Sequence, residues 1–158
     1  MSNTSRNSPA NVSALEIHLG YWLRFVSNHV SHSFKVKLER HGVTVAEWVV
    51  LRALFDESGI KPSAISEKIG LTRGAVSKLL DRLASKSLVA IRADAADGRA
   101  QVITLTASGR RLVPRLAALA DQNDAETFEH LDDEQRAALL SILKSIVERL
   151  DLRAVPID

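Results

Sequence analysis

The chain has 158 residues, no cysteine, a formal net charge of +2 and 46% hydrophobic residues. This length and composition are typical of one globular domain that can bury a core. The lack of cysteine excludes disulfides, thiolate metal sites and cysteine-based redox switches. Because no apolar run could cross a bilayer and the polar N-terminus lacks the apolar core of a signal peptide, we expect a cytoplasmic protein without membrane contact.

The charges are distributed unevenly along the chain. Residues 1–60 contain six Lys or Arg and five Asp or Glu, residues 61–115 contain eleven and four, and residues 116–158 contain four and ten. A basic centre followed by an acidic C-terminal part indicates one face that meets a polyanion and another that is kept away from it. The simpler alternative is random scatter of surface charge.

The N-terminal part begins with a polar stretch and continues as an amphipathic helix. Residues 1–11 are rich in Ser and Asn, which predicts a disordered arm. Apolar residues then recur at steps of three and four from Leu15 to Leu38, which predicts one dimerisation helix over residues 12–41. A helix of about 28 residues is roughly 42 Å long. That is more than a small domain needs, so part of its apolar face should pack on a second copy.

The centre of the chain, residues 44–105, begins with three predicted helices. Thr44, followed three residues later by Glu47, is a capping-box pattern that starts the first helix. The two helices that follow cover residues 62–69 and 72–86 and are joined by a short Gly-Leu turn. Two helices joined in this way are typical of a helix-turn-helix motif that binds DNA.

Two short strands are predicted after the second motif helix. Val89 and Ile91 alternate with other residues in one strand, and Ile103 and Leu105 do so in the other, as in half-buried strands. The sequence between them, Ala-Asp-Ala-Ala-Asp-Gly, is rich in turn-forming residues. Residues 88–105 are therefore predicted to form a two-stranded wing.

The C-terminal part of the chain is again predicted to be helical. Thr106 caps a helix that contains Pro114, which is expected to bend it, and Asp132 caps the last helix. Apolar residues recur in the last helix at steps of three and four, so this face needs a cover. Residues 106–150 are therefore predicted to form the C-terminal dimerisation helices, and residues 151–158 a short tail.

The segment from Ile69 to Leu83, IGLTRGAVSKLLDRL, is followed by Asp97-Gly98-Arg99 and by Leu105-Thr106. These residues resemble the MarR family of bacterial transcriptional regulators, and the likeness covers residues 13–150. The resemblance implies a mainly α (α+β) fold, with a winged helix-turn-helix DNA-binding lobe and a helical dimerisation region from both ends of the chain. It also implies a homodimeric, sequence-specific regulator of transcription, which we expect to be a repressor released by a small aromatic or phenolic effector or its CoA thioester.

Two residues depart from the pattern of the family. Lys61 stands where Ser or Thr commonly caps the first motif helix, and Ser87 stands where the family favours Gly. A missing cap costs about 0.5–2 kcal/mol, and Ser tolerates a left-handed backbone less well than Gly. Both departures concern local stability, and neither removes a DNA contact.

The residues expected to contact DNA lie on the second motif helix and the wing. Arg73 is the expected base reader in the major groove, because a guanidinium matches two acceptors of guanine and discriminates by about 1–3 kcal/mol. Arg99 is the expected probe of the minor groove, its guanidinium oriented by Asp97, and Asp81 is expected to support Arg92 or Arg99. For each residue the simpler alternative is a solvated side chain or a surface ion pair. The predicted set is Thr72, Arg73, Gly74, Ser77, Lys78, Arg82, Asp97 and Arg99.

An effector site is a further expectation from the resemblance. In the family a small aromatic anion binds between the dimerisation helices and the DNA-binding lobe, and shifts the distance between recognition helices. Six residues here offer aromatic walls or partners for a carboxylate; the alternative is that the tryptophans belong to the core and the histidines to the surface. The six are His18, Tyr21, Trp22, His29, Trp48 and Arg52.

We expect no metal, no other cofactor and no enzymatic activity. His29 and His32 are one helical turn apart, but no third suitable ligand is evident near them. The sequence contains no Gly-rich phosphate loop, metal-binding helix motif or nucleophile elbow.

The main alternative from another functional class is a winged-helix protein-interaction module whose basic face binds an acidic partner. Arg73 and Arg99 occupy reading positions on two different elements, which a protein partner would not require together. The partner that we expect is therefore double-stranded DNA, bound by a homodimer at a palindromic operator with half-sites about one helical turn apart.

Overall fold

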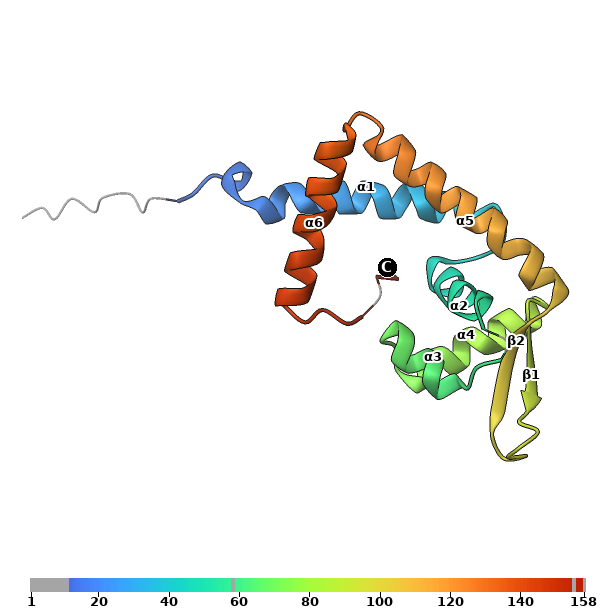
Figure 1. Ribbon diagram of the computed structural model, residues 1–158. Coiled ribbons are helices and arrows are strands. Elements are labelled where there is room, and N and C mark those ends of the chain that lie inside the picture. The colour runs from blue at the N-terminus through green and yellow to red at the C-terminus, as the bar shows by residue number, and fades with distance from the viewer. Residues whose placement is uncertain (1–11, 58, 155, 158) are drawn as a thin grey trace, which may run out of the picture.

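A computed structural model describes residues 12–57, 59–154 and 156–157 of the chain (Figure 1). Helices α2 (Val45–Phe55), α3 (Pro62–Ile69) and α4 (Arg73–Ser85) and the two strands gather in one lobe. Helices α1 (Leu19–Glu39) and α5 (Ala107–Phe128) extend from it, and α6 (Asp133–Arg149) follows the far end of α5. The structure is mainly helical with a two-stranded wing, as predicted. The arm predicted at residues 1–11 lies outside the described residues.

The N-terminal helix is shorter than predicted. A 3-10 turn at Leu15–Ile17 precedes α1 at Leu19–Glu39, and His18 between them has an extended backbone with φ −91° and ψ 123°. The indole N–H of Trp22 donates to the backbone carbonyl of Glu16 at 2.8 Å, so a side chain uses an acceptor that a continuous helix would need. The prediction of one unbroken helix was therefore wrong at its N-terminal end.

The lobe contains the predicted winged helix-turn-helix. Its helices are α2 at Val45–Phe55, α3 at Pro62–Ile69 and α4 at Arg73–Ser85. Its strands, β1 at Val89–Ala93 and β2 at Gln101–Leu105, pair antiparallel. Val89 lies opposite Leu105 at one end and Ala93 opposite Gln101 at the other. The two motif helices lie within one residue of the predicted bounds.

Side-chain caps begin the helices where the sequence predicts them. Thr44, Thr72 and Thr106 each accept a backbone N–H three residues later, at 3.2, 3.2 and 3.0 Å. Asp132 does the same for α6, at 2.8 Å. Helix α3 has no side-chain cap at Lys61, as expected. Each cap satisfies a backbone donor that the helix itself cannot pair.

The hydrophobic core lies inside the lobe and extends beneath α5 at Ala107–Phe128. Every element of the lobe except β1, together with the end of α1, contributes to its deepest part. The apolar residues that are at most 1% exposed are Leu38, Val50, Leu51, Leu54, Ile65, Val76, Leu83, Ile103, Val113 and Leu116.

Helix α6, at Asp133–Arg149, contributes no buried residue to this core. In Figure 1 it turns back from the end of α5 and stands apart from α2 and α4. Large apolar side chains remain exposed along it, and we call them the α6 stripe: Leu140, Ile142, Leu143, Ile146, Val147 and Leu150. The N-terminal half of α1 exposes a second apolar set, comprising Leu19, Trp22, Leu23, Phe25 and Val26.

The C-terminal tail returns to the turn between the two motif helices. Gly70 in that turn has φ +70°, and a Cβ there would lie 2.8 Å from the Cα of Ala154 and from the carbonyl oxygen of Arg153. Both the backbone conformation and the close approach therefore require glycine at this position.

Candidate nucleic-acid interface

Helix α4 is anchored by one apolar face. Val76, Leu79, Leu80 and Leu83 are at most 7% exposed and pack into the core of the lobe. This anchoring leaves the remaining face of the helix to solvent, beginning at its first turn. The exposed residues on α4 and its N-cap include all six that were predicted to contact DNA: Thr72, Arg73, Gly74, Ser77, Lys78 and Arg82.

The first turn of α4 also leaves room for a close approach. A Cβ built at Gly74 would meet no atom within 4 Å, so the space in front of this residue is open. The hydroxyl oxygen of Thr72 accepts the backbone N–H of Ala75, so this side chain holds the helix end in addition to its predicted DNA contact. The geometry suits the N-terminal half of a recognition helix, which enters the major groove.

The wing turn differs from the prediction in one contact. The carboxylate of Asp97 accepts the backbone N–H of Arg99 at 3.1 Å, and among the described residues no ion pair joins the two side chains. Asp97 therefore stabilises the turn. The prediction that it orients the guanidinium of Arg99 was wrong. Within the same part of the chain, the carboxylate of Asp81 makes no ion pair with Arg92 or Arg99.

The middle of β2 pairs with Ile60, the residue before the N-cap of α3. The backbone N–H of Ile60 donates to the carbonyl of Ile103 at 3.1 Å, and the N–H of Ile103 returns a bond of 2.9 Å. Next to this bridge, the ammonium of Lys61 lies 3.4 Å from the carboxylate of Asp94. The backbone N–H of Ala96 and the Lys61 ammonium hold the pKa of the Asp94 carboxyl below its ordinary value. The side chain of Lys61 thus does not cap α3 and instead forms an ion pair with the wing.

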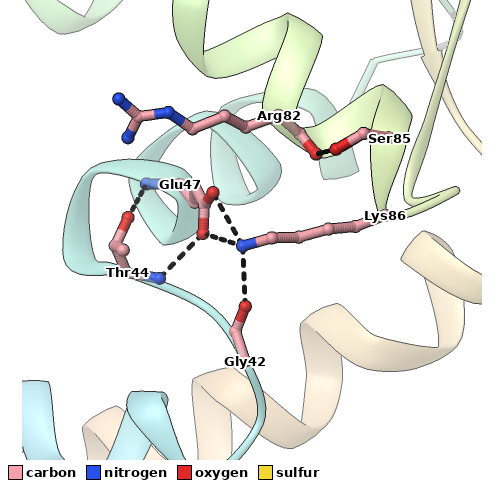
Figure 2. Close-up of polar contacts among 6 residues, drawn as sticks. All are labelled: Gly42, Thr44, Glu47, Arg82, Ser85 and Lys86. Carbon is pink, nitrogen blue, oxygen red and sulfur yellow. Dashed lines mark hydrogen bonds and ion pairs between the residues drawn. The ribbon is translucent and has the colours of Figure 1, made fainter.

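A second ion pair, which no sequence pattern predicted, joins α2 to the C-terminal end of α4 (Figure 2). The ammonium of Lys86 lies 2.8 Å from both carboxylate oxygens of Glu47, whose side chain is 1% exposed. Burial raises the pKa of the Glu47 carboxyl, but the Lys86 ammonium and the Thr44 backbone N–H together hold it below its ordinary value. The capping-box pattern identified Glu47, but nothing local pointed to Lys86.

The six residues predicted for an effector site are not brought together within one chain. Tyr21 stacks edge-on against Trp22, with ring centroids 5.3 Å apart, near the N-terminal end of α1. His18 and His29 are exposed, and Arg52 forms an ion pair of 2.6 Å with the carboxylate of Asp56 at the C-cap of α2. Of the six, Trp48 lines a cavity.

That cavity lies between α1, α2 and α5 and has a volume of about 370 Å³. Its walls are mainly apolar and contain no Lys, Arg or His, so within the described chain it offers no cation for a carboxylate. Asn123 at its edge is 4% exposed, donates to the carbonyl of Val30 at 3.1 Å and accepts from Lys37 at 3.1 Å. The lining residues are Val30, Ser31, Phe34, Val45, Trp48, Val49, Ala120, Asn123, Asp124 and Pro156.

In residues 12–57, 59–154 and 156–157, no group of three or more His, Asp or Glu could hold a metal ion. None of the helices in these ranges is both long and apolar enough to span a membrane.

Known proteins share both the sequence pattern and the fold. A model described as the MarR family matches residues 41–100, which contain α2, α3, α4 and β1. The chain is similar to the HTH-type transcriptional regulator TtmR of Methylorubrum extorquens, with 29% identity over 154 residues, which are 98% of this chain and 76% of the relative.

Two solved structures are similar to this fold. One, from a study of how 6-hydroxynicotinic acid regulates DNA binding by Bordetella bronchiseptica BpsR, has a TM-score of 0.74 and 27% identity over 85% of this chain and 96% of the other. The second is a mutant of E. coli MarR complexed with operator DNA, with a TM-score of 0.73 and 25% identity, covering 84% of this chain and 96% of the other.

Proposed function

The chain belongs to the MarR family of winged helix-turn-helix transcriptional regulators, which are DNA-binding proteins and not enzymes, and on this premise we propose that it acts as a homodimeric repressor. The dimer binds an imperfect palindrome whose half-sites lie about one helical turn apart. A small aromatic acid or its CoA thioester releases it from the operator.

The observation that carries the DNA-binding part of the proposal is the exposed face of α4. An apolar face fixes the helix in the lobe, and the opposite face presents Arg73 and Lys78 from the first two turns. Arg99 stands exposed on the wing, which flanks the recognition helix in this fold. Cations on both elements favour a duplex over an acidic protein partner.

The exposed apolar sets on α6 and α1 support the homodimer. Monomeric proteins rarely leave large contiguous apolar patches in contact with water. An isologous interface would cover the same two sets on both copies at once and would hold two recognition helices at a fixed distance. That arrangement matches a palindrome, which repeats one half-site in opposite orientation.

Gel shifts on operator variants test the division of work between the helix and the wing. We expect Arg73→Ala to weaken specific binding about 5- to 150-fold, because a bidentate contact to guanine contributes about 1–3 kcal/mol. Arg99→Ala should weaken binding most at operators with A·T-rich flanks, where the narrow minor groove attracts a guanidinium. About four phosphate contacts per subunit give a slope of log K against log salt near −7 for the wild type.

Lys35→Ala is the matched control, because it removes one exposed cation from α1, outside the lobe. It should leave the affinity for the operator within about twofold, as expected for a surface ion pair. Equal affinities of Arg99→Ala and the wild type at every flank and salt concentration would show that the wing does not grip the minor groove.

The effector part of the proposal is supported by the ligand regulation of the similar BpsR, and the apolar walls of the cavity beside Trp48 suit an aromatic ring. We expect at least one aromatic acid or CoA thioester to lower operator affinity about 5- to 150-fold, the usual range of coupling between two sites. Footprinting with and without a panel of such compounds measures the effect. A panel that leaves the footprint unchanged would contradict release by aromatic ligands and would leave DNA binding itself standing.

A further inference from the structure

We propose that Lys86 and Glu47 are positioning residues for operator recognition, because Lys86 fixes the recognition helix α4 to Glu47 of α2 and to Gly42 in the turn that follows the dimerisation helix α1. The pair thereby sets the distance between the two recognition helices and so the half-site spacing that the dimer accepts. This inference rests on the proposed function, since spacing has meaning only for a dimer on a palindrome.

The ammonium of Lys86 joins segments from three parts of the chain (Figure 2). Lys86 is the C-cap of α4, Glu47 lies in the first turn of α2, and Gly42 belongs to the turn between α1 and α2. The Nζ atom donates to both oxygens of Glu47 at 2.8 Å and to the carbonyl of Gly42 at 2.7 Å. One side chain thus holds α4, α2 and the end of α1 in a single arrangement.

The carboxylate of Glu47 is fixed from its other side as well. One of its oxygens also accepts the backbone N–H of Thr44 at 2.9 Å, and the Thr44 hydroxyl accepts the backbone N–H of Glu47 at 3.2 Å. A carboxylate held by a capping box has little freedom to follow a moving ammonium. Any rotation of α4 relative to the α1–α2 turn must therefore break charge-assisted hydrogen bonds.

Lys86 is poorly suited to be another DNA contact. An ammonium has three N–H donors, and the three bonds to Glu47 and Gly42 use all of them. Arg82, one turn earlier on α4, differs: Figure 2 shows its guanidinium extending away from the carboxylate of Glu47. The cation at the end of the recognition helix therefore orients the helix, and the cation before it remains available for DNA.

Stability alone does not explain an ion pair at this position. An apolar pair of similar volume is often as stable as a buried ion pair, but the ion pair requires one particular geometry. The next residue, Ser87, has φ +57° and turns the chain from α4 toward β1. The ion pair thus lies at the joint from which both the recognition helix and the wing extend.

Operators with altered spacing test the proposal. Adding or removing one base pair between half-sites moves them by about 3.4 Å and rotates them by about a tenth of a turn. The wild-type dimer should prefer one spacing by about tenfold or more over its neighbours, because a mismatched half-site loses its base contacts. In the double variant Glu47→Leu/Lys86→Met, which replaces the ion pair by an apolar pair, the preference should fall below about threefold.

Lys78→Met is the matched control. It removes a cation from the exposed face of α4, so it should weaken binding at every spacing by a similar factor and keep the ratio between spacings. Glu47→Gln is a second test variant that removes the charge and retains the shape. Sedimentation first selects the variants that remain folded dimers, and if the double variant does not fold, Glu47→Gln is judged by the same ratio.

The outcomes separate this inference from the function on which it rests. A folded dimeric variant that keeps the wild-type preference for spacing would overturn the role of the ion pair. A wild-type protein that binds no palindrome at any spacing would instead overturn the proposed function. A weakened preference in the variants, with the ratio kept in Lys78→Met, is the result expected here.

Discussion

Replacing Ile146 with Asp should convert the dimer into monomers and weaken operator binding by more than about 100-fold. Ile146 lies in the α6 stripe and is 40% exposed in the single chain, so the proposed interface would bury it. Burying an unpaired carboxylate costs several kcal/mol, and a symmetric dimer meets that cost twice. Analytical ultracentrifugation measures the change in mass, and a gel shift on the palindrome measures the loss of affinity.

Ser141→Asp is the control for this substitution, because it adds the same charge to α6 on the side away from the stripe. It should leave both the dimer and the affinity nearly unchanged, since exposed polar substitutions usually alter stability by no more than about 0.5 kcal/mol. A dimer that survives Ile146→Asp would place the interface elsewhere on the chain.

Replacing Lys86 with Met should lower the free energy of unfolding by about 2–3 kcal/mol, because the substitution leaves the carboxylate of Glu47 buried without its partner. This value lies below the cost for a fully buried pair, since the side chain of Lys86 is 38% exposed. In the double variant with Glu47→Leu, the loss should shrink to within about 1 kcal/mol, because no charge is then stranded. Urea unfolding of the wild type, the single variant and the double variant measures all three values.

The pH dependence gives a second readout of the same substitution. In the wild type the pKa of Glu47 is lowered, so its stabilising effect is complete above the ordinary value of 4.5 and is lost as the pH falls through the lowered pKa. In Lys86→Met the main opposing charge is gone, and burial raises the pKa of the carboxyl. The stability difference between the two proteins should therefore be greatest near pH 7 and shrink toward pH 4. A difference independent of pH would show that the cost arises from packing.

Local patterns predicted most of the secondary structure. The caps at Thr44, Thr72, Thr106 and Asp132 depend on residues three positions apart, and each lies where the sequence placed it. The break at His18 was missed, because apolar residues keep their helical spacing across it and the competing bond from a tryptophan side chain has no signature in periodicity.

The contacts that position the interface were less accessible from the sequence. Lys86 and Glu47 are 39 residues apart, and Lys61 meets Asp94 from a different element. A stripe of apolar residues shows which face of a helix is buried, but it does not show which charged side chain arrives from elsewhere in the chain. The predicted effector residues dispersed for the same reason, since Tyr21 and Trp48 lie on helices whose relative placement no local pattern determines.

Because α6 buries no residue within one chain, the fraction of protein that is folded should depend on the protein concentration. If the two copies cover each other's apolar sets, each protomer completes the hydrophobic core of its partner. A higher concentration of protein then favours the folded dimer by mass action. The amount of the regulator in the cell would then determine how much of it is correctly folded as well as how much is bound to DNA. A newly made chain without a partner would expose the α6 stripe to chaperones and proteases, so low expression would deplete the active regulator more than in proportion.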